Sequence, residues 1–287
     1  MAPGRGPTVR RRRLAGEIRK LRERSAMTIE EAAERLGWSI AKVSRIETAR
    51  VGITAPDLTR VLDLYEVEEP KRPALHALAR TARVRGWWDA YADSLRGEYA
   101  TYIELEADAG FIRSFDALAV NGLLQTSDYA YEIVRAALMG LLPPADIQRR
   151  VEVRMTRQKL LAQGDDPLRL WTVIDQAVLN RVVGSPAVMA AQCKSLLGMA
   201  ELPNVTIQVL PATSGAHPAT AGPFSIMQFR EPHDPDVVYL ESMTSSLYVE
   251  SDAEIYRYTL AFDHLRAAAL GTEESKSVIA RSAERFA

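Results

Sequence analysis

The fold of the N-terminal part is decided by the stretch Thr28-Ile-Glu-Glu-Ala-Ala-Glu-Arg-Leu-Gly-Trp-Ser-Ile-Ala-Lys-Val-Ser-Arg-Ile-Glu47. Its apolar residues recur at helical spacing, and Thr28 with Glu31 three residues later forms a capping-box pattern. Gly37 suits the left-handed position that ends a helix, and Ser39 offers the N-cap of a second one. Two short helices joined by a tight turn are the layout of a helix-turn-helix that reads DNA.

The second helix of this stretch has two contrasting faces. Ile40, Val43 and Ile46 point one way, and the opposite face holds small side chains with one long cation, Arg45. Arg45 is long enough to bond a guanine edge with both arms, and Lys42 lies at the flank, near a phosphate. The alternative is a helical hairpin with an ordinary solvated face. The residues expected to contact DNA are Ser39, Ile40, Ala41, Lys42, Ser44, Arg45 and Thr48.

Helices are expected on both sides of this pair. Leu14, Ile18 and Leu21 share a face before it, and a helix capped by Thr54 follows it. A further helix is expected from about residue 72 to residue 85. Five helices with short links predict a small all-α domain.

Charge is unevenly distributed along the 287 residues. The whole chain has a net charge of −1, but residues 1–50 hold 13 Lys and Arg against 6 Asp and Glu, a balance of +7 that leaves −8 for the remainder. A polyanion partner is therefore expected only at the N-terminal end. Within the run 10–13, Arg10, Arg11 and Arg12 are candidates to follow phosphates or enter a minor groove. The alternative is a solvated tail.

The N-terminal part resembles the repressor-type helix-turn-helix family, also called Cro/C1 or XRE. Ala26 and Ala49 stand where glycine is common in that family, which leaves the geometry of two loops open. The residues that carry the resemblance are Leu21-Arg22, Ala32, Leu36-Gly37, Ser44-Arg45-Ile46-Glu47 and Leu58.

Other classes of protein lack support in the sequence. An apolar run near ~18 residues is missing, so no membrane span is expected, and no apolar segment makes the basic N-terminus a signal peptide. The single cysteine, Cys193, fits a reducing cytoplasm and a buried position. No phosphate-binding glycine loop, nucleophile elbow or metal-ligand spacing is found. We expect neither an enzyme nor a cofactor nor a metal site.

The pattern of residues along the sequence changes from residue 87 onward, and the domain boundary is placed between residues 84 and 85. The fold class is thus an all-α helix-turn-helix domain, 1–84, followed by a larger α+β domain, 85–287, with a small mixed sheet. Helices are expected at 87–107, 143–163, 186–202, 253–270 and 273–285. Strands are expected at 111–120, 168–175, 205–210, 224–229, 237–241 and 247–250.

Roughly from Tyr99 to Ile279, the chain resembles the DUF5753 domain, which follows a repressor-type helix-turn-helix in actinobacterial regulators linked to a toxin–antitoxin-like system. Asn121 and Asp175 depart from the family's usual proline and glutamate. The resemblance implies a transcriptional regulator, often encoded beside a small protein of the DUF397 type. The motifs that carry it include Gly122-Leu-Leu-Gln-Thr126, Arg154-x-x-Arg157-Gln158, Asp175-Gln-Ala177, Gln208-Val-Leu-Pro211, Gly222-Pro-Phe224 and Tyr239-Leu-Glu241.

Several polar residues of this second domain are candidates for a ligand or partner site. A stripe on the helix 143–163 could bind an anionic metabolite, or it could pair internally with Asp175, Glu241 or Glu106. The loop 213–222 is either a lid over a site or a plain connection between strands. The candidates are Arg154, Arg157, Gln158, Asp175, His217, Tyr239 and Glu241.

Two functions follow. The first is a sequence-specific DNA-binding transcriptional regulator that binds double-stranded DNA as a homodimer. Its C-terminal domain would sense a small-molecule effector or a small protein partner, or mediate dimerisation. The second is an antitoxin-like protein that mainly binds a small DUF397-type partner, with autoregulatory DNA binding.

Overall fold

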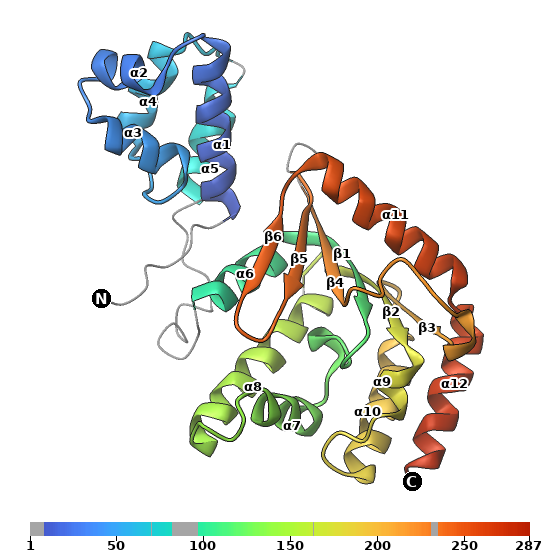
Figure 1. The fold of residues 1–287 in the computed structure, drawn as a ribbon. Helices are drawn as coiled ribbons and strands as arrows, with labels where there is room; N and C mark the ends of the chain where they lie inside the picture. The colour runs from blue at the N-terminus through green and yellow to red at the C-terminus, as the bar shows by residue number, and fades with distance from the viewer. Residues whose placement is uncertain (1–8, 70, 82–96, 163, 231–234) are drawn as a thin grey trace. The chain divides into compact units, whose positions relative to one another are not determined.

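The computed structural model describes residues 9–69, 71–81, 97–162, 164–230 and 235–287 (Figure 1). The described chain divides into two compact units, and the division along the chain falls within α6 (Gly97–Asp108), between Leu105 and Glu106. The predicted boundary between residues 84 and 85 lies outside the described residues, as does the first part of the helix predicted for 87–107.

Besides the first part of α6, the first unit contains α1 (Val9–Arg24), α2 (Ile29–Leu36), α3 (Ile40–Glu47), α4 (Ala55–Leu64) and α5 (Arg72–Thr81). Apolar faces from the helices meet in one buried core, which includes Ile18, Leu36, Ile46, Leu58 and Leu62. The helical class predicted for this part is confirmed.

Local signals set the boundaries of α2 and α3. The Thr28 hydroxyl accepts a hydrogen bond from the Glu31 amide, and the Glu31 carboxylate accepts one from the Thr28 amide, which completes the predicted capping box. Gly37 ends α2 with a φ of 66°, in the left-handed region that glycine adopts without strain. The alanines that stand at glycine positions, Ala26 and Ala49, also adopt positive φ values of 52° and 57°.

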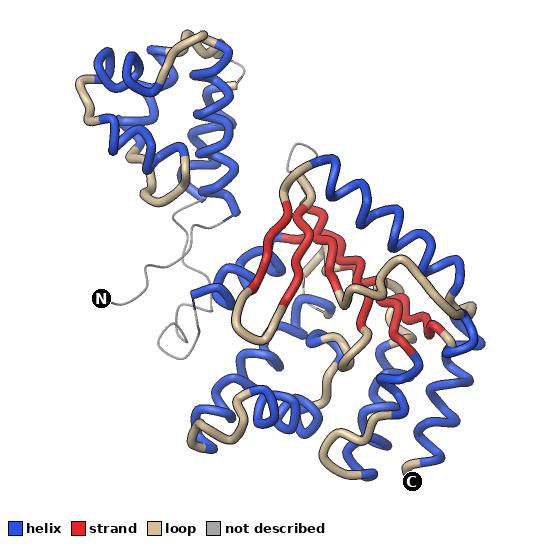
Figure 2. The backbone as a smooth tube through the Cα atoms, viewed as in Figure 1, coloured by secondary structure: helices blue, strands red, loops and turns tan. Residues whose placement is uncertain are grey.

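The second unit is built around a six-stranded mixed sheet with the order β3-β2-β1-β4-β5-β6 (Figure 2). Three strands are parallel: β1 (Ala109–Asp116), β2 (Arg169–Asp175) and β3 (Val205–Leu210). Three more extend it with antiparallel pairing: β4 (Phe224–Phe229), β5 (Val237–Glu241) and β6 (Ser246–Val249). The predicted α+β class with a mixed sheet is confirmed, although the first strand ends at 116 and not at 120.

Helices cover both faces of the sheet. The crossover from β1 to β2 contains α7 (Ser127–Ala137) and α8 (Pro144–Gln158), and that from β2 to β3 contains α9 (Gln176–Asn180) and α10 (Pro186–Met199). Figure 1 shows α11 (Asp252–Ala268) along one side of the sheet and α7, α8 and α10 on the other. Phe262 of α11 packs in a core with Phe115 and Val173, and α12 (Thr272–Arg285) packs against α10.

Candidate nucleic-acid interface

The helix α3 presents the face predicted to read DNA. Ser39 caps it by accepting a hydrogen bond from the Lys42 amide, and Val43 and Ile46 are buried in the core. On the opposite side, Ala41, Arg45 and Thr48 are exposed and Ser44 is half-buried. Small side chains along this face leave room for the helix backbone to come close to the floor of a major groove.

Ile40 does not share the buried face on which its spacing placed it. Its side chain is 51% exposed. Ile40 is the first residue of α3, about one turn before Val43, the first α3 side chain buried in the core. The core does not extend to this end of the helix, and at about 100° per residue Ile40 lies closer around the axis to Ser44 than to Val43.

Arg45 is held by its own helix. Its Nε donates a hydrogen bond to the Ala41 carbonyl at 3.1 Å, so the guanidinium folds back toward the N-terminal end of α3. The two Nη groups lie beyond this bond and form a fork of the kind that matches the O6 and N7 acceptors of guanine. The Thr48 hydroxyl donates to the Ser44 carbonyl at 2.7 Å, which leaves its oxygen as an acceptor.

Lys42 is engaged within the protein. Its Nζ lies 3.0 Å from Asp57 Oδ2 and 3.8 Å from the centre of the Trp38 ring, which Arg60 also approaches. The Arg60 guanidinium donates to the Leu36 carbonyl at the end of α2. These contacts tie α3 to α4, and a phosphate contact from Lys42 must compete with Asp57.

A buried ion pair fixes the C-terminal end of α3. Arg22 of α1 donates from Nε and Nη2 to the two carboxylate oxygens of Glu47, at 2.8 and 3.0 Å, and both side chains are buried. This hydrogen bonding raises the pKa of Arg22. Both residues belong to the family pattern in the sequence, but their pairing could not be predicted, because no local periodicity relates positions 25 residues apart.

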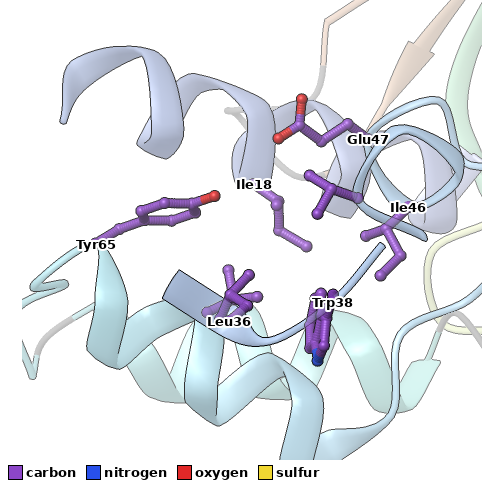
Figure 3. Close-up of a pocket in the computed structure, with 8 residues that line it drawn as sticks. Ile18, Leu36, Trp38, Ile46, Glu47 and Tyr65 are labelled. Carbon is purple, nitrogen blue, oxygen red and sulfur yellow. The ribbon is translucent and has the colours of Figure 1, made fainter. Parts of the chain in front are cut away.

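The interior of the helix-turn-helix is closed. A small cavity of about 10 Å³ lies beside Glu47. Figure 3 shows Ile18, Leu36, Trp38, Ile46 and Tyr65 around it. This volume holds about one water molecule. Burial, together with the Glu47 charge, raises the pKa of Tyr65 to about 12, so the phenol stays protonated. The cavity is part of the core and has no room for a larger ligand.

The arginines expected to form a basic arm begin the first helix. The side chain of Arg10 lies outside those described, whereas Arg11 and Arg12 are half-buried residues of α1. Burial lowers the pKa of Arg11. In this helical setting they are a basic flank and not an extended tail.

The arginine stripe of α8 makes internal contacts. Arg157 donates from Nε and Nη2 to both Glu106 oxygens, at 2.6 and 2.7 Å, and the pair is buried. Arg154 donates to the Gln125 side-chain oxygen, and Gln158 donates to the Gln125 carbonyl. The structure thus shows the internal pairing with Glu106 that was one of the sequence alternatives.

The remaining candidate residues lie on separate elements. Asp175 caps α9, and its Oδ1 accepts from the Ala177 amide at 2.8 Å. The His217 ring packs edge-on against Phe115, and its Nδ1 has no hydrogen-bond partner in the described structure. Tyr239 contacts the Ser246 hydroxyl, and Glu241 is exposed at the end of β5. These residues thus belong to other elements than the α8 stripe.

One carboxylate that sequence analysis missed lies at the end of β1. Asp116 Oδ2 accepts from the Ser114 hydroxyl at 2.7 Å and from the Thr172 hydroxyl at 2.6 Å, and Asn121 adds weaker bonds. Burial of the carboxyl group among these neutral donors raises its pKa to about 6. Only the register of β1 and β2 brings Thr172 beside it, so no spacing in the sequence indicates this cluster.

The described residues lack two features. They contain no group of three or more His, Cys, Asp or Glu side chains arranged to hold a metal ion. None of the helices they form is both long and apolar enough to cross a membrane. Cys193 is buried, and burial raises the pKa of its thiol to about 11.

Comparison with known proteins divides the chain in the same way. A family model described as a helix-turn-helix domain matches residues 13–83. A second, described as a domain of unknown function (DUF5753), matches residues 99–281. No curated protein and no solved structure matches the chain. The two resemblances seen in the sequence are confirmed by these matches.

Proposed function

Because the chain belongs to the DUF5753 family and carries a helix-turn-helix domain, we propose that it is a sequence-specific DNA-binding transcriptional regulator. The observation that carries the proposal is α3, whose buried side fixes it to the core while Ala41, Arg45 and Thr48 face outward. The +7 balance of residues 1–50 supports a polyanion partner at this unit. The proposed location of the regulator is the cytoplasm.

The proposed complex is a homodimer on two half-sites. A single helix of this size makes few base contacts, and proteins of this type commonly bind as dimers with half-site centres about 34–36 Å apart. In each half-site Arg45 reads a guanine, while Ser39, Ala41, Ser44 and Thr48 contact neighbouring groups. The half-buried Arg11 and Arg12, with Arg10, contact phosphates at the flank.

The test is base preference measured with matched arginine variants. The full chain is used to select duplexes from a random pool, and affinities are then measured by fluorescence anisotropy. Arg45→Ala should lose about 1–3 kcal/mol of discrimination at one guanine per half-site. Arg19→Ala, which removes an exposed arginine paired with Glu23 on α1, should keep every base preference. Unchanged preferences in Arg45→Ala would exclude α3 as the reading helix.

The C-terminal unit is proposed to receive the regulatory signal, either by dimerising or by binding an effector. One observation favours a protein partner. In the loop between α7 and α8, Met139 and Leu141 lie two positions apart and are 71% and 75% exposed, and a protein partner would remove this apolar pair from water. The second candidate function is therefore an antitoxin-like protein that binds a small DUF397-type partner and regulates its own synthesis.

This second function is tested by co-expression with the small protein encoded beside the gene. Co-purification that is lost in Met139→Ser/Leu141→Ser supports it. Met243→Ser is the matched control, because Met243 is 87% exposed in the turn between β5 and β6. If the small protein does not co-purify with the unaltered chain, the antitoxin-like function is wrong, and the DNA-binding proposal is unaffected.

A further inference from the structure

An aliphatic side chain is exposed at the start of the reading helix. Ile40 is 51% exposed, whereas the other large apolar side chains described in α1 to α5 are buried or half-buried. It contributes little to the cap of α3, because the Ser39 hydroxyl makes the cap bond to the Lys42 amide. Ile40 therefore presents apolar surface at the N-terminal end of α3. This is the end of the helix that is proposed to enter the groove.

The chemistry of the major groove restricts what this surface can contact there. The edges of the bases offer hydrogen-bond donors and acceptors, and the apolar group among them is the C5-methyl of thymine. In helix-turn-helix proteins the N-terminal residues of the second helix contact these edges. We propose that Ile40 is a specificity-determining residue that selects thymine through van der Waals contact with this methyl group. The inference rests on the proposed docking of α3 in DNA.

The position of the thymine relative to the guanine follows from Arg45. Its Nε is bonded to the Ala41 carbonyl, so the guanidinium lies near the level of Ala41, the residue next to Ile40. Successive helix residues rise about 1.5 Å and successive base pairs about 3.4 Å. This offset along the helix is smaller than one base-pair step, and a G·C pair carries no thymine methyl, so the two side chains address neighbouring base pairs. The expected half-site has a thymine directly beside the guanine that Arg45 reads.

The test removes one methyl group from the DNA. After selection of a binding site with the full chain, the thymine beside the Arg45-dependent guanine is replaced by deoxyuridine in each half-site, and affinity is measured by anisotropy. The affinity of the unaltered protein for DNA should fall about fourfold per half-site, the factor that corresponds to one methyl group returned to water. Ile40→Ala should bind the two duplexes equally and should keep its preference for the guanine.

Arg45→Ala is the matched control: it should lose the guanine preference and still discriminate thymine from deoxyuridine. Because Ile40 is largely solvent-exposed, Ile40→Ala should fold, which circular dichroism checks. Equal binding of thymine and deoxyuridine by the unaltered protein overturns the inference, as does full discrimination by Ile40→Ala. If selection yields no preferred sequence at all, the proposed DNA reading fails as well. A selected site without a methyl effect removes only the role of Ile40.

Discussion

Replacement of Asp116 by asparagine should stabilise the C-terminal unit at neutral pH. The carboxylate is surrounded by neutral donors, and its pKa is raised from 3.8 to about 6 by burial. At pH 7 the folded protein therefore holds a charge that is better solvated in the unfolded chain. Asparagine removes the charge, and the hydroxyls of Ser114 and Thr172 can reorient to bond the amide.

The size of the effect follows from the pKa difference. Between pH 4 and pH 6 the folded state retains a proton that the unfolded state has released, so stability falls as pH rises through this window. A difference of about two units corresponds to about 3 kcal/mol at 1.36 kcal/mol per unit. The stabilisation that comes from the retained proton is present below pH 4 and is lost by pH 7. Asp116→Asn lacks this pH-dependent contribution.

The assay is urea unfolding followed by circular dichroism, with both proteins measured at pH 4.5, 5.5, 6.5 and 7.5. As pH rises across this range, the unfolding free energy of the unaltered protein should fall relative to that of Asp116→Asn. Thr172→Val removes a donor to the carboxylate and should extend the pH-dependent window upward. Parallel pH profiles for the unaltered protein and Asp116→Asn would show that the pKa of Asp116 is not raised by folding.

Three further predictions concern the helix-turn-helix. Glu47→Ala leaves the Arg22 charge buried without its carboxylate, and urea unfolding should show a loss of about 3–5 kcal/mol; a loss below ~1 kcal/mol would contradict a buried pair. Asp57→Asn releases Lys42 for a phosphate, so anisotropy titrations should show tighter DNA binding, and the slope of log affinity against log salt concentration should be steeper by about one. An unchanged slope would show that Lys42 faces no phosphate. Ala26→Gly relieves a positive φ of 52° and should raise stability by up to about 1 kcal/mol, and a lower melting temperature would count against it.

The features that could be predicted from the sequence are those encoded by residues close together in the chain. The capping box of Thr28 and Glu31, the turn at Gly37 and the cap at Ser39 each involve groups within four positions. Helix and strand positions in the second unit followed from periodicity and turn residues. Such local signals need no knowledge of which elements meet.

The features that sequence analysis missed depend on which elements meet in three dimensions. The pairing of Arg22 with Glu47 and the engagement of Lys42 by Asp57 require the packing of separate helices. Arg157 had three candidate partners in the sequence, and only the fold selects Glu106. The exposure of Ile40 was missed because periodicity gives an angle around a helix but not where the core ends.

If α3 reads the major groove, methylation of guanine in the binding site should interfere with binding. Dimethyl sulfate places a methyl group on guanine N7, an acceptor that the Arg45 fork is proposed to use. Methylation of one guanine in each of two half-sites, about 10 base pairs apart, should abolish binding by the unaltered protein. Arg45→Ala should show no interference at these guanines. Binding that is insensitive to guanine methylation in the unaltered protein would contradict the account.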